Sequence, residues 1–65
     1  MNVGVARINS VDQRQKAEFW MLQVTRWTEK KDFRRSKLAM QMALGHVHLA
    51  ETYEEWMDVS KREEG

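Results

Sequence analysis

The fold is decided by the stretch Leu38-Ala39-Met40-Gln41-Met42-Ala43-Leu44-Gly45-His46-Val47-His48-Leu49-Ala50, which on an α-helix is apolar almost all the way round. A surface helix of a lone small domain needs only one apolar stripe, facing its own core. We therefore expect this helix to be covered from two sides. The chain is predicted to complete its core with a second chain.

Length and composition favour the same conclusion. A chain of 65 residues is one small domain, and it buries only about 60% of the surface that its unfolded form exposes. Such scaffolds need disulfides, a metal or oligomerisation, and a sequence without cysteine has neither disulfides nor a thiolate zinc site. Oligomerisation is therefore the expected way in which this chain completes its core. The net charge of +1 argues against a uniformly charged partner surface.

A first helix is predicted over residues 10–30. Ser10 and Gln13 have the spacing of a capping box, in which the serine accepts from an early helical amide and the glutamine reaches back. Ala17, Trp20, Val24 and Trp27 follow at helical spacing, whereas Phe19 and Leu22 fall on a different face. Residues 1–9, with alternating Val3 and Val5, are expected to form a short strand or an extended arm.

A turn is predicted between about Glu29 and Lys37, where basic residues interrupt the apolar pattern. Asp32 has the chemistry of an N-cap for a second helix over residues 33–61, and Phe33 is expected to plug the end of a bundle. The alternative is one uninterrupted helix of about fifty residues in a coiled coil. Its heptad pattern of apolar residues would be interrupted at the basic stretch.

The expected fold is thus all-α: a two-helix antiparallel hairpin with a short N-terminal extended arm, one domain over residues 1–65, self-associating as a four-helix bundle dimer. The residues expected in the core or the oligomer interface are Ala17, Phe19, Trp20, Leu22, Val24, Trp27, Leu38, Met40, Met42, Leu44, His46, Val47, Leu49, Tyr53 and Trp56. Among these, Met40, Leu44 and Val47 form a smaller patch opposite the main face of the second helix.

The charges are locally bipolar. A basic turn comprises Arg26, Lys30, Lys31, Arg34, Arg35 and Lys37, and an acidic tail comprises Glu51, Glu54, Glu55, Asp58, Glu63 and Glu64. Cations at the start of a helix and acids toward its end oppose the helix dipole. Antiparallel pairing of two hairpins, with the basic turn of one beside the acidic tail of the other, would explain this order. The basic turn is also the candidate partner-binding surface, for phosphates or for an acidic protein.

No catalytic, metal or cofactor site is predicted. The sequence lacks a Gly-x-Ser-x-Gly context, a thiol and a glycine-rich phosphate loop. His48 and Glu51 are one turn apart, but di-iron helical proteins place the glutamate first, as Glu-x-x-His. His46 and His48 are instead expected at the core or its boundary, where they can make assembly pH-dependent.

The favoured function is a small non-enzymatic interaction protein of the inhibitor, adaptor or antirepressor type, cytoplasmic and typical of phages or plasmids, that binds another macromolecule as a helical oligomer. The architecture resembles the Rop class of plasmid copy-number regulators, which implies RNA as a possible partner. A nucleic-acid-binding regulator is the alternative: a strand over Val3 to Ile8 followed by two helices resembles ribbon-helix-helix repressors, with Arg34 to Leu38 as the start of their second helix. A third candidate is a phage protein that sequesters a nucleotide signal, which Asp32-x-Arg34 before Leu38-Ala39 resembles. No membrane partner is expected.

Overall fold

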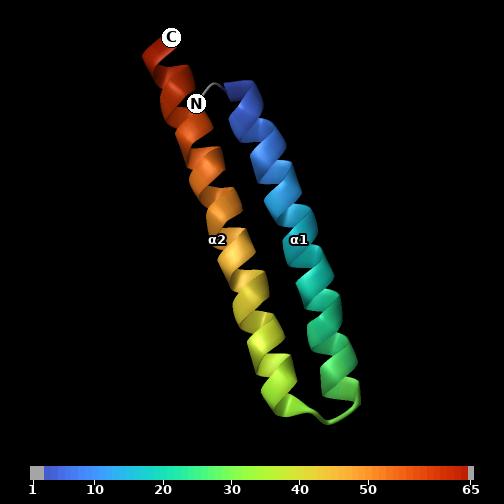
Figure 1. The fold of residues 1–65 in the computed structure, drawn as a ribbon. Helices are drawn as coiled ribbons and strands as arrows, with labels where there is room; N and C mark the ends of the chain where they lie inside the picture. Colours follow the sequence, from blue (N-terminus) through green and yellow to red (C-terminus); the bar gives the residue numbers. More distant parts are fainter. Residues whose placement is uncertain (1–2, 65) are drawn as a thin grey trace.

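The computed structural model describes residues 3–64, and side chains over residues 3–63. It consists of two α-helices, α1 (Val3–Glu29) and α2 (Phe33–Glu64). Figure 1 shows them side by side and antiparallel along their whole length, joined at one end by a tight turn. The Cα trace is 51 Å long and only 14 and 13 Å across, so the two helices form a narrow rod. We call the two sides on which both helices are accessible its broad faces. The predicted hairpin is confirmed.

Two predictions are wrong: that residues 1–9 form an extended arm, and that the first helix begins at Ser10. Helix α1 is already formed at Val3, and residues 1–2 of the expected arm lie outside the described residues. Ala6 and Ser10 are both buried, one helical turn apart on the side of α1 that faces α2. Because Ala6 and Ser10 are buried against α2, the helix continues through the region where the capping-box pattern predicted its beginning. Because residues 3–8 are helical, they do not form the strand that the resemblance to ribbon-helix-helix repressors implied.

The turn at residues 30–32 ends α1 and begins α2, which rules out the uninterrupted helix. The amides of Lys31 and Asp32 donate to the carbonyls of Thr28 and Trp27, both at 2.9 Å. This is the Schellman pattern, and Lys31 takes the left-handed conformation, with φ 59°, that glycine usually provides. Asp32 then caps α2 as predicted, because its Oδ1 accepts from the amide of Arg35 at 3.1 Å.

Small side chains form the contact between α1 and α2. The buried residues of the described chain are Ala6, Ser10, Ala17, Ala39, Ala43 and Ala50. Among the described residues no large side chain is fully buried. Methyl-sized side chains let two helix backbones approach closely, but each buries little apolar area. Since burial contributes about 25 cal/mol of stability per Å² of apolar surface, each alanine stabilises the contact only slightly. The hairpin therefore has close-packed helices and almost no bulky core of its own.

Two polar clasps join the helices across this contact. Arg14 on α1 reaches Glu54 on α2, with Nε donating to Oε2 at 3.0 Å and Nη2 also bonded to Oε1. On the opposite side of the hairpin, Nδ1 of His46 lies 2.5 Å from Oε1 of Gln13. A shorter-range bond lies near the turn, where the hydroxyls of Thr28 and Ser36 are 2.7 Å apart. The two clasps join residues that are 40 and 33 positions apart in the sequence.

Candidate functional site

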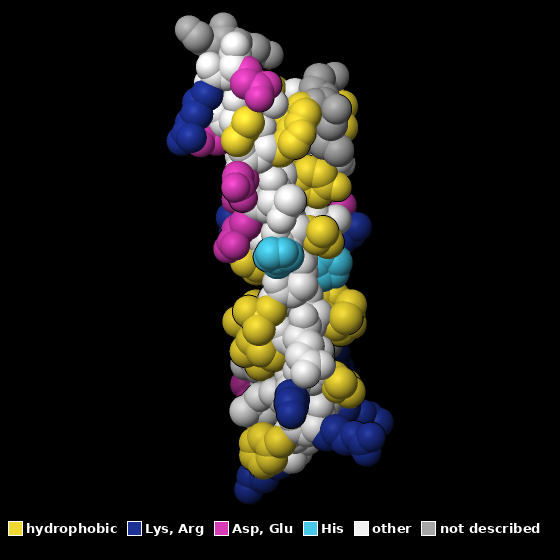
Figure 2. Space-filling model, turned by 90° about the vertical axis from the view of Figure 1, so that its left-hand side faces the viewer, with side chains coloured by type: hydrophobic (Ala, Val, Ile, Leu, Met, Phe, Trp, Pro, Cys, Tyr) yellow, Lys and Arg dark blue, Asp and Glu magenta, His cyan; other side chains and the backbone are white. Residues whose placement is uncertain are grey.

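Most bulky apolar residues are exposed, and the others are only half-buried at the edges of the contact between the helices. Figure 2 shows hydrophobic side chains in several groups on the surface, on both sides of the hairpin. The exposed ones in the described chain are Val5, Ile8, Val11, Phe19, Met21, Leu22, Phe33, Leu38, Met42, Leu44, Leu49, Trp56 and Val59. Such surfaces on a small protein mark interaction sites.

One stripe of exposed uncharged residues runs along α2, and we call it the seam: Leu38, Met42, Gly45, Leu49, Thr52, Trp56 and Val59. Its members alternate at spacings of four and three residues, which is the pattern of a helix that packs lengthwise against another helix. Charged residues flank the seam only near the two ends of α2, at positions 34–37 and from 51 onward; between residues 38 and 50 no face of the helix carries Asp, Glu, Lys or Arg.

Tryptophans of α1 border the seam. Trp20 and Trp27 are half-buried and, with Leu38 and Met42, line a hollow of about 230 Å³ between the two helices. The cations of the turn lie over the outer tryptophan: Lys30 Nζ is 5.1 Å and Arg35 Cζ 4.8 Å from the centre of the Trp27 ring. These are cation–π distances. Bulky residues and open space therefore alternate on this face.

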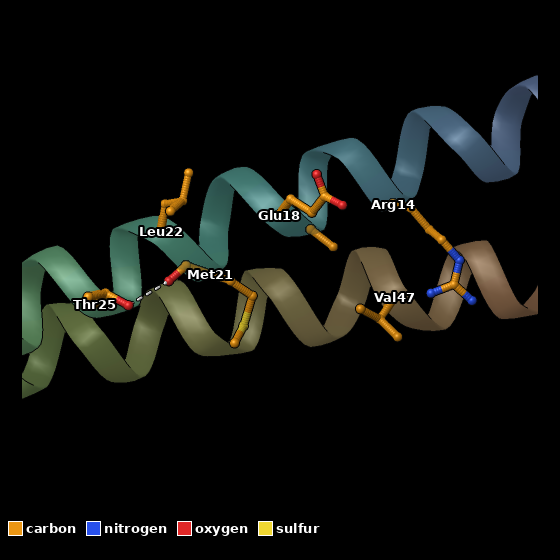
Figure 3. A pocket seen from close by; sticks show the side chains of 7 residues that line it. Arg14, Glu18, Met21, Leu22, Thr25 and Val47 are labelled. Atoms are coloured by element: carbon orange, nitrogen blue, oxygen red, sulfur yellow. Dashed lines mark hydrogen bonds between the residues drawn. The ribbon is translucent and has the colours of Figure 1, made fainter.

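A second, wider groove lies on the other broad face. It has a volume of about 560 Å³ and is lined by Arg14, Ala17, Glu18, Met21, Leu22, Thr25 and Val47. In Figure 3, Met21 reaches from α1 across to α2, Val47 lies further along α2, and Arg14 is at one end. The hydrogen bond and the charge of Arg14 hold the pKa of the Glu54 carboxyl below its ordinary value. The groove is mostly apolar and has one charged end.

A third apolar surface lies on α1, away from α2. Ile8, Val11, Phe19 and Leu22 are all more than half exposed, at 52 to 70%. The Phe19 and Trp20 rings meet edge to face at 5.3 Å, which links this stripe to the seam side of the hairpin. Phe33 is also exposed, at 67%, so within one hairpin it plugs no core.

The basic turn is fully accessible. All six cations predicted there are exposed, and dark blue side chains gather around the turn end in Figure 2, with acidic ones toward the other end. Arg35 has an ion pair with Asp32 at 3.4 Å. The remaining cations project in several directions rather than lining one concave surface.

The structure divides the predicted interface residues into three groups. Ala17 is buried; Trp20, Val24, Trp27, Met40, His46, Val47 and Tyr53 are half-buried; Phe19, Leu22, Leu38, Met42, Leu44, Leu49 and Trp56 are exposed. Sequence reasoning missed the alanines at 6, 39, 43 and 50 as the residues between the helices. Their spacing of four and seven residues is the signal that could have identified them.

The described residues contain no group of three His, Cys, Asp or Glu side chains placed to hold a metal ion. Over the part of the chain that the structure covers, neither helix is long and apolar enough to cross a membrane. The chain matches no protein-family model, no curated protein and no solved structure.

Proposed function

We propose that this chain is a small non-enzymatic interaction protein, in which hairpins associate as a dimer and the dimer binds another macromolecule. The observation that carries the proposal is the inverted distribution of side-chain size. Alanine fills the centre of the contact between α1 and α2, while all the leucines, both phenylalanines, Met21, Met42 and Trp56 are exposed and the other tryptophans are only half-buried. An isolated domain of this length is marginally stable when its bulky residues face water.

Self-association is the simplest way to cover these residues. A second hairpin presents the same apolar faces, and the bipolar charge order lets basic and acidic ends meet when two rods are antiparallel. One partner rod covers one broad face. The other apolar surfaces of the dimer remain available for a different macromolecule, which is the reason to propose an adaptor or inhibitor.

Light scattering and sedimentation at micromolar concentration test the assembly. We expect the mass of two chains and no concentration-dependent monomer at physiological salt. A protein that is helical by circular dichroism and has the mass of one chain would contradict the proposal, because its apolar faces would then be stable in water.

Nucleic-acid binding is the second candidate, and the exposure of every cation in the basic turn favours it. Phosphate contacts by lysine and arginine give an affinity that falls steeply with salt. The spread of these cations around the turn favours a protein or an intramolecular role over a defined phosphate groove. A salt titration of RNA and DNA binding separates the two candidates.

A further inference from the structure

We propose that the seam of α2 is the surface on which a second copy of this chain docks, antiparallel, with a twofold axis beside residue 47. The inference rests on the proposed function, since it assigns a face and a register to the dimer. In this register Gly45 lies opposite the partner's Leu49, and Leu38 lies opposite the partner's Trp56.

Hollows and bulky side chains alternate along the seam. One hollow, of about 240 Å³, is lined by Gln41, Met42, Gly45, His46 and Leu49. A Cβ added to Gly45 would meet nothing within 4 Å. The next hollow along is the one beside Leu38, which Trp20 and Trp27 border. The seam thus has hollows beside residues 45 and 38, and a third of about 270 Å³ beside Trp56. Leu38 is itself exposed, at 55%, so only the position of Gly45 lacks a side chain of its own.

The protruding residues have the same separation as the hollows. Leu49 and Trp56 are exposed on the seam and are seven residues apart, as are Leu38 and Gly45. Seven residues of helix span about 10.5 Å. When the second copy runs antiparallel, its Leu49 enters the hollow at Gly45 while its Trp56 packs beside Leu38, next to the hollow that Trp20 and Trp27 border. By symmetry the same two contacts form a second time.

Charge selects the antiparallel direction. A twofold axis at residue 47 brings the basic turn of one copy beside the end of the partner's α2, where residues 58, 63 and 64 are acidic and residues 61 and 62 basic, with Arg62 paired to Asp58 within the helix. Lys31 and the partner's Glu63 are equidistant from the axis. A parallel pair would instead align basic turn with basic turn, which opposes association.

The outline of the hairpin is of the same order as the area that stable pairs bury. The hairpin outline, 51 Å by 14 Å, corresponds to roughly 700 Å² per copy, close to the roughly 800 Å² per partner of standard stable interfaces. The groove on the other broad face, lined by Met21 and Val47 among others, is left open. That groove and the α1 stripe are the surfaces that remain for a different partner.

Engineered cysteines test the register directly, because the chain has none of its own. The test variant is Met42→Cys/Thr52→Cys, whose positions face each other across the axis in two symmetric pairs. Within one chain they are ten residues, about 15 Å, apart, too far for a disulfide. The control, which we call the outer control, is Leu44→Cys/Glu51→Cys; it is centred on nearly the same point but lies on the flank of α2 that carries Met40 and Val47, away from the seam.

We expect mild oxidation, or a short bismaleimide, to convert the test variant into a covalent dimer as the main species on a gel. Met42→Cys alone, Thr52→Cys alone and the outer control should remain single chains. If the double variant loses its helical signal, an equimolar mixture of the two single variants tests the same contact with one substitution per chain.

Each contrary result has its own meaning. Covalent dimers from the single variants would show a parallel pair and overturn the register. Cross-linking of the outer control in place of the test variant would overturn the seam as the docking face. In both cases light scattering still gives the mass of two chains, so the proposed function survives. A folded parent protein with the mass of one chain would remove both.

Discussion

Arg14 binds Glu54 across the hairpin through two hydrogen bonds, although 40 residues separate them in the sequence. The pair lies at the end of the open groove and joins the middle of α1 to the second half of α2. It is solvent-accessible, with side-chain exposures of 49% and 35%. Its contribution to stability is therefore modest, and its more visible effect is on proton binding.

Acid should weaken the hairpin partly through this pair. The hydrogen bond from Arg14 lowers the pKa of Glu54 from its ordinary 4.5, so the unfolded chain binds this proton more tightly than the folded one. Stability from the pair is then complete above the unfolded pKa and is lost as the pH falls through the folded one. Thermal melts at about pH 7 and about pH 3 should show a smaller loss for Glu54→Gln than for the parent. Equal losses would contradict this.

Substitution of Gly45 should distinguish a covered face from a free one. Gly45→Ala should raise the stability by about 0.5–1 kcal/mol per chain, because glycine is unfavourable inside a helix. Gly45→Leu has a similar helical gain, but in the proposed dimer its side chain collides with the partner's Leu49 and costs about 1–3 kcal/mol. Sedimentation should show weaker dimerisation for Gly45→Leu alone. If both variants strengthen the protein equally, position 45 faces solvent.

The left-handed residue of the turn gives a prediction of opposite sign for two adjacent lysines. Lys31→Gly should stabilise the hairpin by about 0.5–1 kcal/mol, because φ 59° is strained for a residue with a side chain. Lys30→Gly removes the same charge without relieving a positive φ, and should be neutral or destabilising. Urea denaturation of the two variants and the parent measures the difference. A higher stability for Lys30→Gly would contradict the conformation of the turn.

Enlarging a residue of the helix contact should be costly. Ala43 is 1% exposed, and Ala43→Leu should destabilise the hairpin by about 1–3 kcal/mol, because added methylenes force close-packed helices apart. Gln15→Leu introduces the same side chain on the exposed side of α1 and should change stability by less than about 0.5 kcal/mol. Urea midpoints provide the comparison, and equal values would place position 43 outside the contact.

Neutralising the basic turn should leave the fold largely intact. Replacing Lys30, Lys31, Arg34 and Arg35 with glutamine removes an exposed ion pair and two cation–π contacts, each worth about 1 kcal/mol or less. As an interaction protein, the parent should bind hairpin RNA or duplex DNA only weakly at physiological salt. Tight, salt-sensitive binding in gel-shift titrations, lost in the variant, would establish the nucleic-acid candidate instead.

The sequence was sufficient for the hairpin because its strongest signals were local. Basic residues interrupting an apolar pattern predicted the turn, and an aspartate just before Phe33 predicted the cap. The beginning of α1 was missed because Ser10 and Gln13 satisfy a capping pattern that depends on sequence alone. In the folded chain these two residues serve tertiary contacts: Ser10 is buried and Gln13 binds His46.

The composition of the helix contact was less predictable for a physical reason. Periodicity gives most weight to bulky residues, so Leu38, Met42 and Trp56 defined the expected main face of α2. The closest approach of two helices instead favours residues with the least volume, and Ala39, Ala43 and Ala50 occupy it. Single-chain patterns cannot state which of two apolar faces meets its own chain, because both are hydrophobic.

The alanine contact also determines how the hairpin responds to a lengthwise force. Methyl groups on two facing helices form a smooth surface, without long side chains that interlock and oppose axial sliding. Resistance to such sliding therefore comes from the turn at residues 30–32 with the Thr28–Ser36 bond beside it, from the half-buried side chains at the edges of the contact, and from two clasps, Arg14 with Glu54 and Gln13 with His46. The two clasps are the polar bonds that set the axial alignment far from the turn.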